Sequence, residues 1–418
     1  MSIELSHKHK VNVSSETGRL RAVLLHRPGV EITRMTPQNA ASALYSDILN
    51  KPLVDKEYNG FCGVLEKWTD VYYVKDVLAE VLKDDTLREQ LVKESCKADG
   101  CQHLVKKLME LDVERLADVL IEGYECDDWD QENGKDDDRY ELKPLYNLFF
   151  ARDASSTVYN QVLINSMSFA VRSRETLIYK AIFENYFGCE TLNAQRWSSH
   201  ARTEGGDVQI ARNNMLCIGE GIRTNRKGIE YLAQEMSKKH EQFNILVQEL
   251  PHSPESFIHL DMVFTFLGKH ECMAFEPMLK KTGVFSGMDT TLISIENGNI
   301  KYNHCGNLME GLAATGWDIK PILCGGTDVW TQQREQWHSG ANFFSLDDGK
   351  VLGYSRNHHT IDALDKAGYA VLNAADICSG KVDMNNYAKF VAAFDACELP
   401  RGGGGARCMT MPVNRDEQ

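Results

Sequence analysis

The chain has 418 residues, of which 43% are hydrophobic and 25% charged, a composition typical of soluble globular proteins. Its formal net charge of −14 offers no attraction for nucleic acid or an anionic membrane surface, so we expect neither as a partner, whereas a cation site suits it. No apolar stretch is long enough to span a bilayer, and the first residues lack the apolar core of a signal peptide. The 12 cysteines form no C-x-x-C pair, which predicts a reduced, cytoplasmic protein without a zinc site or disulfide framework.

The first predicted strand is the apolar run at residues 20–26, which a turn at Arg27-Pro28-Gly29 ends. Residues 84–142 differ from their surroundings, because leucine and valine recur there at helical spacing. We therefore expect one catalytic domain over residues 1–418, with a small all-helical insert at 84–142. An acidic run at 127–138 follows the helical pattern, but Asn133 occupies the place where an EF-hand loop needs glycine, so we interpret the run as a solvated loop.

From residue 153 onward, a pattern of two strands, an arginine and a helix recurs along the chain. The three copies begin near Ser156, Asp207 and Ala341, and their arginines are Arg172, Arg223 and Arg356. Similar units of this kind predict a radial repeat closed on itself rather than one open sheet. No Gly-x-Gly-x-x-Gly follows a strand and no Gly-Lys-Ser/Thr occurs, so the sequence gives no support to a nucleotide cofactor.

Cys408 ends a glycine-rich segment that contains four consecutive glycines and the arginines Arg401 and Arg407. Glycine lets a backbone approach a ligand closely, because no Cβ stands in the way. Positive charge near a cysteine favours the thiolate, which is the nucleophilic form. The segment therefore predicts a cysteine nucleophile.

Three short motifs each place a carboxylate just before a predicted strand: residues 147–153, 203–207 and 259–261. Taken singly, such carboxylates are typical of turns. If they converge with His259 and Cys408, the set suits a guanidinium substrate. Two carboxylates can bind its nitrogens, the thiolate can attack its carbon, and the imidazole can protonate the departing amine.

These motifs resemble those of arginine deiminases of the guanidine-modifying enzyme superfamily, and the similarity covers nearly the whole chain. The resemblance implies an α/β fold, the five-fold pseudosymmetric α/β propeller called the pentein fold. It implies that Cys408 is the nucleophile, that His259, oriented by Glu204, is the acid and then the base, and that Asp153 and Asp261 clasp the guanidinium. The positions that it assigns to substrate binding are Asn147, Phe150, Arg172, Arg223, Asp207 and Gly402. The implied reaction is hydrolysis of free L-arginine to L-citrulline and ammonia, with no metal or organic cofactor.

The sequence departs from the family pattern in three places. Gly403 stands where many deiminases have an arginine, the insert looks short, and the segment 378–399 is longer than expected. Residues 387–394 of that segment are expected to form a helical turn or two. A deiminase of a modified arginine, an arginine dihydrolase, an amidinotransferase and a non-catalytic arginine sensor therefore stay open, as does a homo-oligomer.

Overall fold

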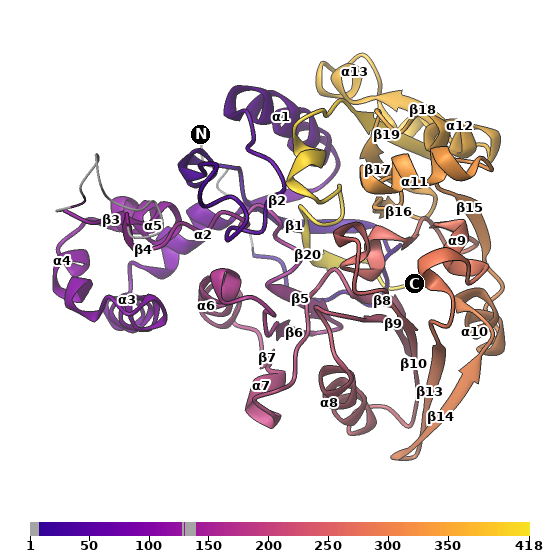
Figure 1. The fold of residues 1–418 in the computed structure, drawn as a ribbon, viewed down its shortest axis with the longest axis horizontal. Helices are drawn as coiled ribbons and strands as arrows, with labels where there is room; N and C mark the ends of the chain where they lie inside the picture. Colours follow the sequence, from indigo (N-terminus) through magenta and orange to yellow (C-terminus); the bar gives the residue numbers. More distant parts are fainter. Residues whose placement is uncertain (1–7, 128, 130–138) are drawn as a thin grey trace.

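The computed structural model describes residues 8–127, 129 and 139–418 and has a mixed α/β fold (Figure 1). Asn133 and most of the acidic run around it lie outside the described residues. The interpretation of that run as a solvated loop therefore stays a prediction.

Five of the six sheets in the described residues share one pattern, in which an antiparallel pair continues into a parallel third strand. The five sets of three strands are β20 (Met411–Arg415), β1 (Leu20–Leu25) and β2 (Asp70–Tyr73); β5 (Ser155–Val158), β6 (Gln161–Ile164) and β7 (Thr191–Leu192); β8 (Val208–Arg212), β9 (Met215–Glu220) and β10 (Gln242–Glu249); β11 (Phe264–Phe266), β12 (Glu271–Ala274) and β15 (Lys320–Leu323); and β16 (Phe344–Asp347), β17 (Lys350–Tyr354) and β19 (Phe390–Phe394). The predicted strand at 20–26 and the strand pairs of the three predicted copies are confirmed.

Two of these sheets carry additional strands. The hairpin of β13 (Thr290–Glu296) and β14 (Asn299–Cys305) pairs with β10, and β18 (Ala370–Asn373) pairs with β19. In the first sheet, β1 near the start of the chain pairs with β20 near its end, in a register that sets Leu24 opposite Met411 (Figure 1). The segment that carries Cys408 is therefore held by a sheet that both ends of the chain build.

Helices connect the strands within the sets or link one set to the next, and they lie toward the outside of the molecule in Figure 1. They are α1 (Lys51–Trp68), α2 (Val74–Val81), α6 (Ser173–Ala181), α7 (Ala194–Trp197), α8 (Arg226–Ser237), α9 (Glu276–Leu279), α10 (Leu308–Ala314), α11 (Val329–Trp337), α12 (His358–Lys366) and α13 (Ala374–Cys378). Several begin at a side chain that accepts a hydrogen bond from a free backbone N–H of the first turn, as Asn50 does for α1 and Asn225 for α8. None of the helices in the described part of the chain is both long and apolar enough to cross a lipid bilayer.

The predicted insert consists of α3 (Asp85–Asp99), α4 (Val105–Met109) and α5 (Val113–Glu122), followed by the short hairpin strands β3 (Tyr124–Glu125) and β4 (Tyr140–Leu142). The prediction that it is all-helical is wrong at this end, because Gly123 leaves the helical conformation with a positive φ of 87° and the chain turns into a strand. Leu91 and Leu120 of the insert pack in the same apolar cluster as Ile178 of α6. The insert is therefore packed against the body of the molecule, at the left of Figure 1.

The predicted helical turn at 387–394 is also wrong. Residues Phe390–Phe394 form β19, in which all five side chains are buried and which pairs in parallel with β17 and with β18. A short continuous apolar run fits a buried helix and a buried strand equally well by its pattern alone. Parallel neighbours on both edges favour the strand.

Candidate functional site

The five sheets place a polar residue at equivalent positions, shortly before their first strand. Asp153 lies two residues before β5, Asp207 one before β8, Asp261 three before β11, Asn342 two before β16 and Cys408 three before β20. All five are buried. The repeated unit therefore brings one polar side chain from each sheet into the interior.

Two of these residues, Asp153 and Cys408, line a cavity of about 780 Å³. Of the predicted site residues, its lining includes Asn147, Phe150, Asp153, Arg172, Arg223, His259, Gly402 and Cys408. Three predicted residues, Glu204, Asp207 and Asp261, are fully buried and do not line it. They contact the lining residues or the backbone beside them, as described below.

The thiol of Cys408 is 4% exposed and lies between an amide and a carboxylate. Asn342 donates from Nδ2 to the Cys408 sulfur at 3.2 Å, and the Asp261 carboxylate oxygens lie 3.8 and 3.9 Å from the same sulfur. Burial, with the negative charges of Asp261 and Asp153, raises the pKa of Cys408 well above its usual range. These surroundings therefore favour the neutral thiol.

The positive charge of the glycine-rich segment does not dominate the protonation of Cys408: Arg407 lowers the pKa of the thiol, as predicted, but burial and the charges of Asp261 and Asp153 raise it by more. Arg401 is half exposed and forms an ion pair with Glu398 at 2.8 Å. Arg407 is buried, but its guanidinium pairs with Asp261 at 2.8 Å and with Glu16 at 3.0 Å. Both guanidinium groups are paired with carboxylates, which reduces the positive charge available to stabilise a thiolate.

His259 is buried and carries a hydrogen bond between its Nε2 and Glu204 Oε2, at 3.0 Å. Its Nδ1 lies 3.8 Å from Asp153 Oδ1. Burial opposes the charged imidazolium, but the carboxylates of Asp153, Glu204 and Asp207 outweigh it and raise the pKa of His259 to about 9. Burial likewise opposes the charged form of Glu204, but the hydrogen bond from His259 and the charge of Arg223 lower its pKa to about 2. The pair is therefore an imidazolium and a carboxylate at neutral pH.

Arg172 lies deep in the cavity wall, where it is already paired. Its guanidinium contacts Asp153 Oδ2 at 2.5 Å and Glu175 Oε2 at 2.8 Å, and it also donates to the backbone oxygen of Asn147 at 3.3 Å. The other Asp153 oxygen, Oδ1, has no hydrogen-bond partner within the described part of the chain. Because an unpaired buried acceptor is unfavourable, this oxygen is ready to accept from a ligand.

Arg223 keeps more of its donors free than Arg172 does. It contacts Glu204 Oε2 at 3.3 Å and lies over the ring of Phe169, 4.7 Å from the centroid. Its Nε is buried and has no partner among residues 8–127, 129 and 139–418. Of the two predicted carboxylate-binding arginines, Arg223 is the one with an unused buried donor.

The glycine-rich loop packs on Phe150 and leaves space at position 403. A Cβ on Gly404 would lie 2.4 Å from the Phe150 ring, and one on Gly402 would lie 3.3 Å from it. Gly403 has a positive φ of 91°, and a Cβ there would have no atom within 4 Å. The open space therefore does not require glycine at 403, but the backbone conformation favours it.

Asp207 was predicted to bind the substrate, and the structure gives its carboxylate another contact. Oδ1 accepts a hydrogen bond from the backbone N–H of Leu260 at 2.9 Å, and burial raises the pKa of Asp207 to about 7. Asp207 therefore holds the backbone beside His259 and lies outside the cavity lining.

Sequence reasoning missed Asn342, which contacts the Cys408 sulfur directly. The repeat offered a signal for it, because Asn342 precedes β16 just as the carboxylates precede their own strands. The pattern instead placed Asn342 inside the predicted strand pair of the third copy, which begins near Ala341. Among the described residues, no group of three or more histidine, cysteine or acidic side chains is arranged to hold a metal ion, and the absence of a cofactor stays a prediction.

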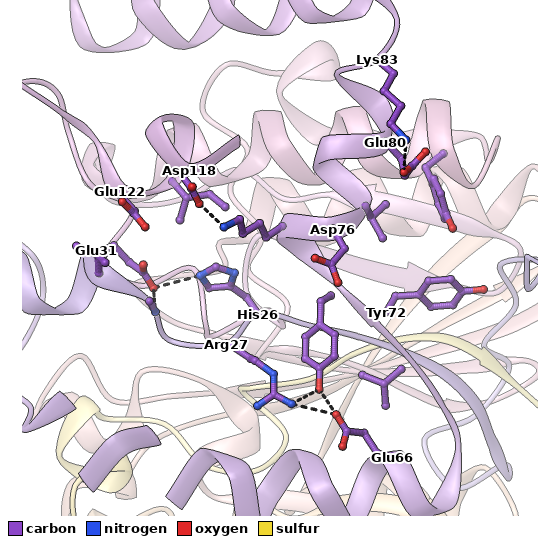
Figure 2. Close-up of a pocket in the computed structure, with 18 of the residues that line it drawn as sticks. His26, Arg27, Glu31, Glu66, Tyr72, Asp76, Glu80, Lys83, Asp118 and Glu122 are labelled. Carbon is purple, nitrogen blue, oxygen red and sulfur yellow. Dashed lines mark hydrogen bonds and ion pairs between the residues drawn. The ribbon is translucent and has the colours of Figure 1, made fainter. Parts of the chain in front are cut away.

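A second cavity, of about 1070 Å³, lies between α1, α2 and α5 and is lined largely by charged side chains (Figure 2). Its cations are paired with carboxylates: Arg27 with Glu66 at 3.0 Å, Lys83 with Glu80 at 2.6 Å, and Lys75 with Asp118. No cysteine is among its lining residues. It therefore lacks a nucleophile of the kind found at Cys408.

Comparison with known proteins agrees with the motifs in the first cavity. The family model for arginine deiminase matches residues 42–415. The chain belongs to the arginine deiminase family. Among curated members, the arginine deiminase of Levilactobacillus brevis is 30% identical over 429 aligned positions, which cover 97% of this chain and 99% of that protein. The arginine deiminase of Bacillus cytotoxicus is 31% identical, with coverage of 98% and 100%.

Solved structures share the fold of this family member at low sequence identity. The N-terminal domain of ArgZ, an arginine dihydrolase from the ornithine-ammonia cycle in cyanobacteria, superposes with a TM-score of 0.54 at 13% identity, covering 94% of this chain and 97% of that one. SxtG, an amidinotransferase from Microseira wollei in the saxitoxin biosynthetic pathway, gives 0.54 at 16% identity, with 98% of each chain covered. The mixed α/β fold therefore matches pentein-fold structures.

Proposed function

We propose that this chain is an arginine deiminase that converts free L-arginine and water to L-citrulline and ammonia through a covalent intermediate on Cys408. The observation that carries the proposal is the buried thiol of Cys408 beside Asp261 and Asp153, in a cavity that also contains the protonated His259. We further propose that the five sheets form a five-fold pseudosymmetric propeller, that residues 1–418 are one catalytic domain containing the insert 84–142, and that the protein is cytoplasmic.

The guanidinium binds where the cavity offers negative charge and free acceptors. Asp153 lines the cavity and its Oδ1 has no hydrogen-bond partner in the described structure, so this oxygen accepts from one guanidinium nitrogen. Asp261 accepts from another with the oxygen that now faces the thiol. A planar cation suits two carboxylates, since each N–H···O⁻ bond is charge-assisted.

Binding of that cation also activates the thiol. Burial first, and then the charges of Asp261 and Asp153, raise the pKa of Cys408. A guanidinium placed between them offsets both negative charges and favours loss of the thiol proton to solvent. The substrate itself therefore adds positive charge to that of Arg407, which is paired with Glu16 and Asp261.

The bond changes follow from these protonation states. The Cys408 thiolate attacks the guanidinium carbon and forms a C–S bond in a neutral tetrahedral centre. The His259 imidazolium donates a proton to one amine, the C–N bond breaks, and ammonia leaves an alkylthiouronium cation on the sulfur. Neutral His259 then takes a proton from water as the hydroxide adds to the same carbon. When the C–S bond breaks, the electron pair returns to sulfur, citrulline forms, and the released proton leaves with ammonia as ammonium.

The far end of the substrate faces arginines and an amide in the cavity wall. Arg223 has an unused Nε donor, and Arg172 and Asn147 lie in the same cavity. These groups suit the α-carboxylate of free arginine, which agmatine lacks. We therefore expect L-arginine to be a much better substrate than agmatine.

The test is incubation of the purified protein with L-arginine, with quantification of citrulline, ornithine and ammonia. We expect equal amounts of citrulline and ammonia, no ornithine, and loss of both products in Cys408→Ala. The control is Cys305→Ala, which removes another free thiol from the distant strand β14 and keeps activity. Ornithine with twice the ammonia would identify a dihydrolase. Product formation only with an added amine acceptor would identify an amidinotransferase, and no product at all would exclude free arginine as the substrate.

A further inference from the structure

Asn342 contacts the reacting sulfur and both segments beside it. Its Nδ2 donates to the Cys408 sulfur at 3.2 Å and to the backbone oxygen of Asp261 at 3.1 Å. Its Oδ1 accepts from the backbone N–H of Arg407 at 2.9 Å and of Cys408 at 3.3 Å. The side chain is 2% exposed, so these contacts replace solvent.

The hydrogen bonds permit only one orientation of this amide. If oxygen and nitrogen were exchanged, the oxygen would face the carbonyl oxygen of Asp261 and the nitrogen would face two backbone N–H donors. Both arrangements leave buried polar groups unsatisfied, which is costly. The N–H of Asn342 is therefore directed at the sulfur.

The glycine-rich loop is shaped to let Asn342 reach this place. A Cβ on Gly405 would lie 2.6 Å from Asn342 Oδ1 and 2.7 Å from its Cβ, closer than atoms in contact allow. Gly405 is thus needed where the loop passes Asn342. The position is also the one at which other sheets carry Asp153, Asp207 and Asp261, so the fold uses it to direct polar groups inward.

An amide differs from those carboxylates in the one respect that matters to a thiolate. A third carboxylate beside the sulfur would add negative charge and offer no hydrogen, whereas an amide is neutral and donates. Across the described residues, Asn342 is the side chain that donates a hydrogen bond to the Cys408 sulfur. Burial and two carboxylates oppose the thiolate, so this donor acts where stabilisation is most needed.

We propose that Asn342 is a further catalytic residue, whose Nδ2–H donates to the Cys408 sulfur, stabilises the thiolate and fixes the direction from which it attacks. The inference rests on the proposed role of Cys408 as nucleophile. It adds that the hydrogen bond is stronger to the thiolate than to the thiol, so it lowers the barrier to attack rather than improving substrate binding.

The test uses Asn342→Asp and Asn342→Ala. The aspartate variant keeps the shape and the acceptor for the two backbone N–H groups but replaces the donor with an oxygen. The alanine variant removes the donor without adding charge. The matched control is Asn357→Asp, because Asn357 is another buried asparagine whose Nδ2 donates to a backbone oxygen, that of His338 at 3.0 Å, away from the sulfur.

The first readout is the pH dependence of Cys408 alkylation by iodoacetamide without arginine, followed by mass spectrometry of the peptide that contains Cys408. We expect the profile to move to higher pH in both Asn342 variants, more in the aspartate variant, and to stay in place in Asn357→Asp. The second readout is steady-state kinetics with arginine. We expect kcat to fall about 10–100-fold, the loss of one hydrogen bond to a charged group, with little change in KM.

Folded Asn342 variants whose alkylation profile matches the unsubstituted protein would overturn the proposal. An equal fall in kcat and in thermal stability for Asn342→Ala and Asn357→Asp, without a shift in the profile, would assign Asn342 a structural role instead. Alkylation does not need turnover, so it separates failure of this inference from failure of the proposed deiminase activity.

Discussion

Two cavities of this molecule are each lined by a buried histidine that pairs with a buried glutamate, and they differ in what surrounds the imidazole. His259 and Glu204 are joined at 3.0 Å, and His26 and Glu31 at 3.1 Å (Figure 2). His259 also faces Asp153 at 3.8 Å and shares its cavity with a thiol. In the other pair, Glu31 accepts a second hydrogen bond from the backbone N–H of Gly29 at 2.6 Å, which holds the turn after β1. A buried histidine–glutamate pair alone therefore does not indicate a catalytic site. The carboxylate of Asp153 and the thiol of Cys408 beside His259 distinguish the two pairs.

The remaining charges of the two cavities differ in burial. In the Cys408 cavity, Arg172 has a side chain only 4% exposed and pairs with carboxylates that are equally buried. In the second cavity, the side chains of Lys75 and Lys83 are 45% and 59% exposed. Exposed ion pairs contribute little to stability, whereas removing one partner of a buried pair is costly. The comparison predicts large effects in one cavity and small effects in the other.

The largest effect is expected for His259→Gln, which removes the proton donor. We expect kcat/KM to fall by about 10²–10⁴, the usual contribution of general acid–base catalysis. The matched control is His26→Gln, the same substitution in the other buried pair, which keeps the kcat of the unsubstituted protein. Arginine turnover assays on both variants test the difference, and an equal loss in the two would show that the surrounding groups do not distinguish the pairs.

Arg407→Ala is expected to cost stability through its buried partners. The substitution leaves Asp261 and Glu16 without the guanidinium that they share, and removing one member of a buried ion pair costs about 3–5 kcal/mol. Urea unfolding monitored by circular dichroism measures the change. A loss of less than about 1 kcal/mol in the free energy of unfolding is typical of exposed ion pairs, and it would show that the pairs of Arg407 contribute no more than surface pairs do.

The raised pKa of His259 predicts a pH dependence of both activity and stability. The imidazolium donates the proton, so kcat is expected to fall as pH rises through about 9, approaching tenfold per pH unit above it. The folded pKa lies above the ordinary value of 6.5, so the stabilisation is fully present below 6.5 and is lost as pH rises through about 9. For Glu204, whose folded pKa is lowered to about 2 from 4.5, the stabilisation is present above 4.5 and is lost as pH falls toward 2.

Rate profiles and urea unfolding from pH 6 to 10, compared with His259→Gln, measure these effects. The stability difference between the two proteins is expected to shrink above pH 9. A difference that stays constant from pH 6 to 10 would contradict the raised pKa.

The smallest effect is expected for Lys75→Met in the second cavity. Lys75 pairs with Asp118 at the surface, and such a pair contributes about 0–1 kcal/mol. We expect the free energy of unfolding to change within that range, with a smaller change at high salt. We expect kcat/KM for arginine to stay the same. A large loss of activity would indicate that the second cavity takes part in the reaction.

The local sequence pattern was sufficient to predict much of this fold and most of the predicted site residues that line the first cavity. Apolar runs ended by turns marked β1 and the strand pairs of the three copies, because strands and turns depend on neighbours in the chain. The motifs around Asp153, His259 and Cys408 were visible because thiols, imidazoles and carboxylates before strands form a rare combination. The run at 390–394 was misread, because a buried strand and a buried helix share the same apolar composition.

By itself, the sequence determined the repeated unit, the family motifs and the identity of the groups available for chemistry. The tertiary structure alone decided which of these groups touch. Arg407 forms a hydrogen bond with Glu16, which is 391 positions away in the chain, and Asn342 forms one with Cys408, which is 66 positions away. Protonation states follow from such contacts, because burial and neighbouring charge act through distance in space. For that reason, the high pKa of the Cys408 thiol, the raised pKa of His259 and the role proposed for Asn342 required the structure.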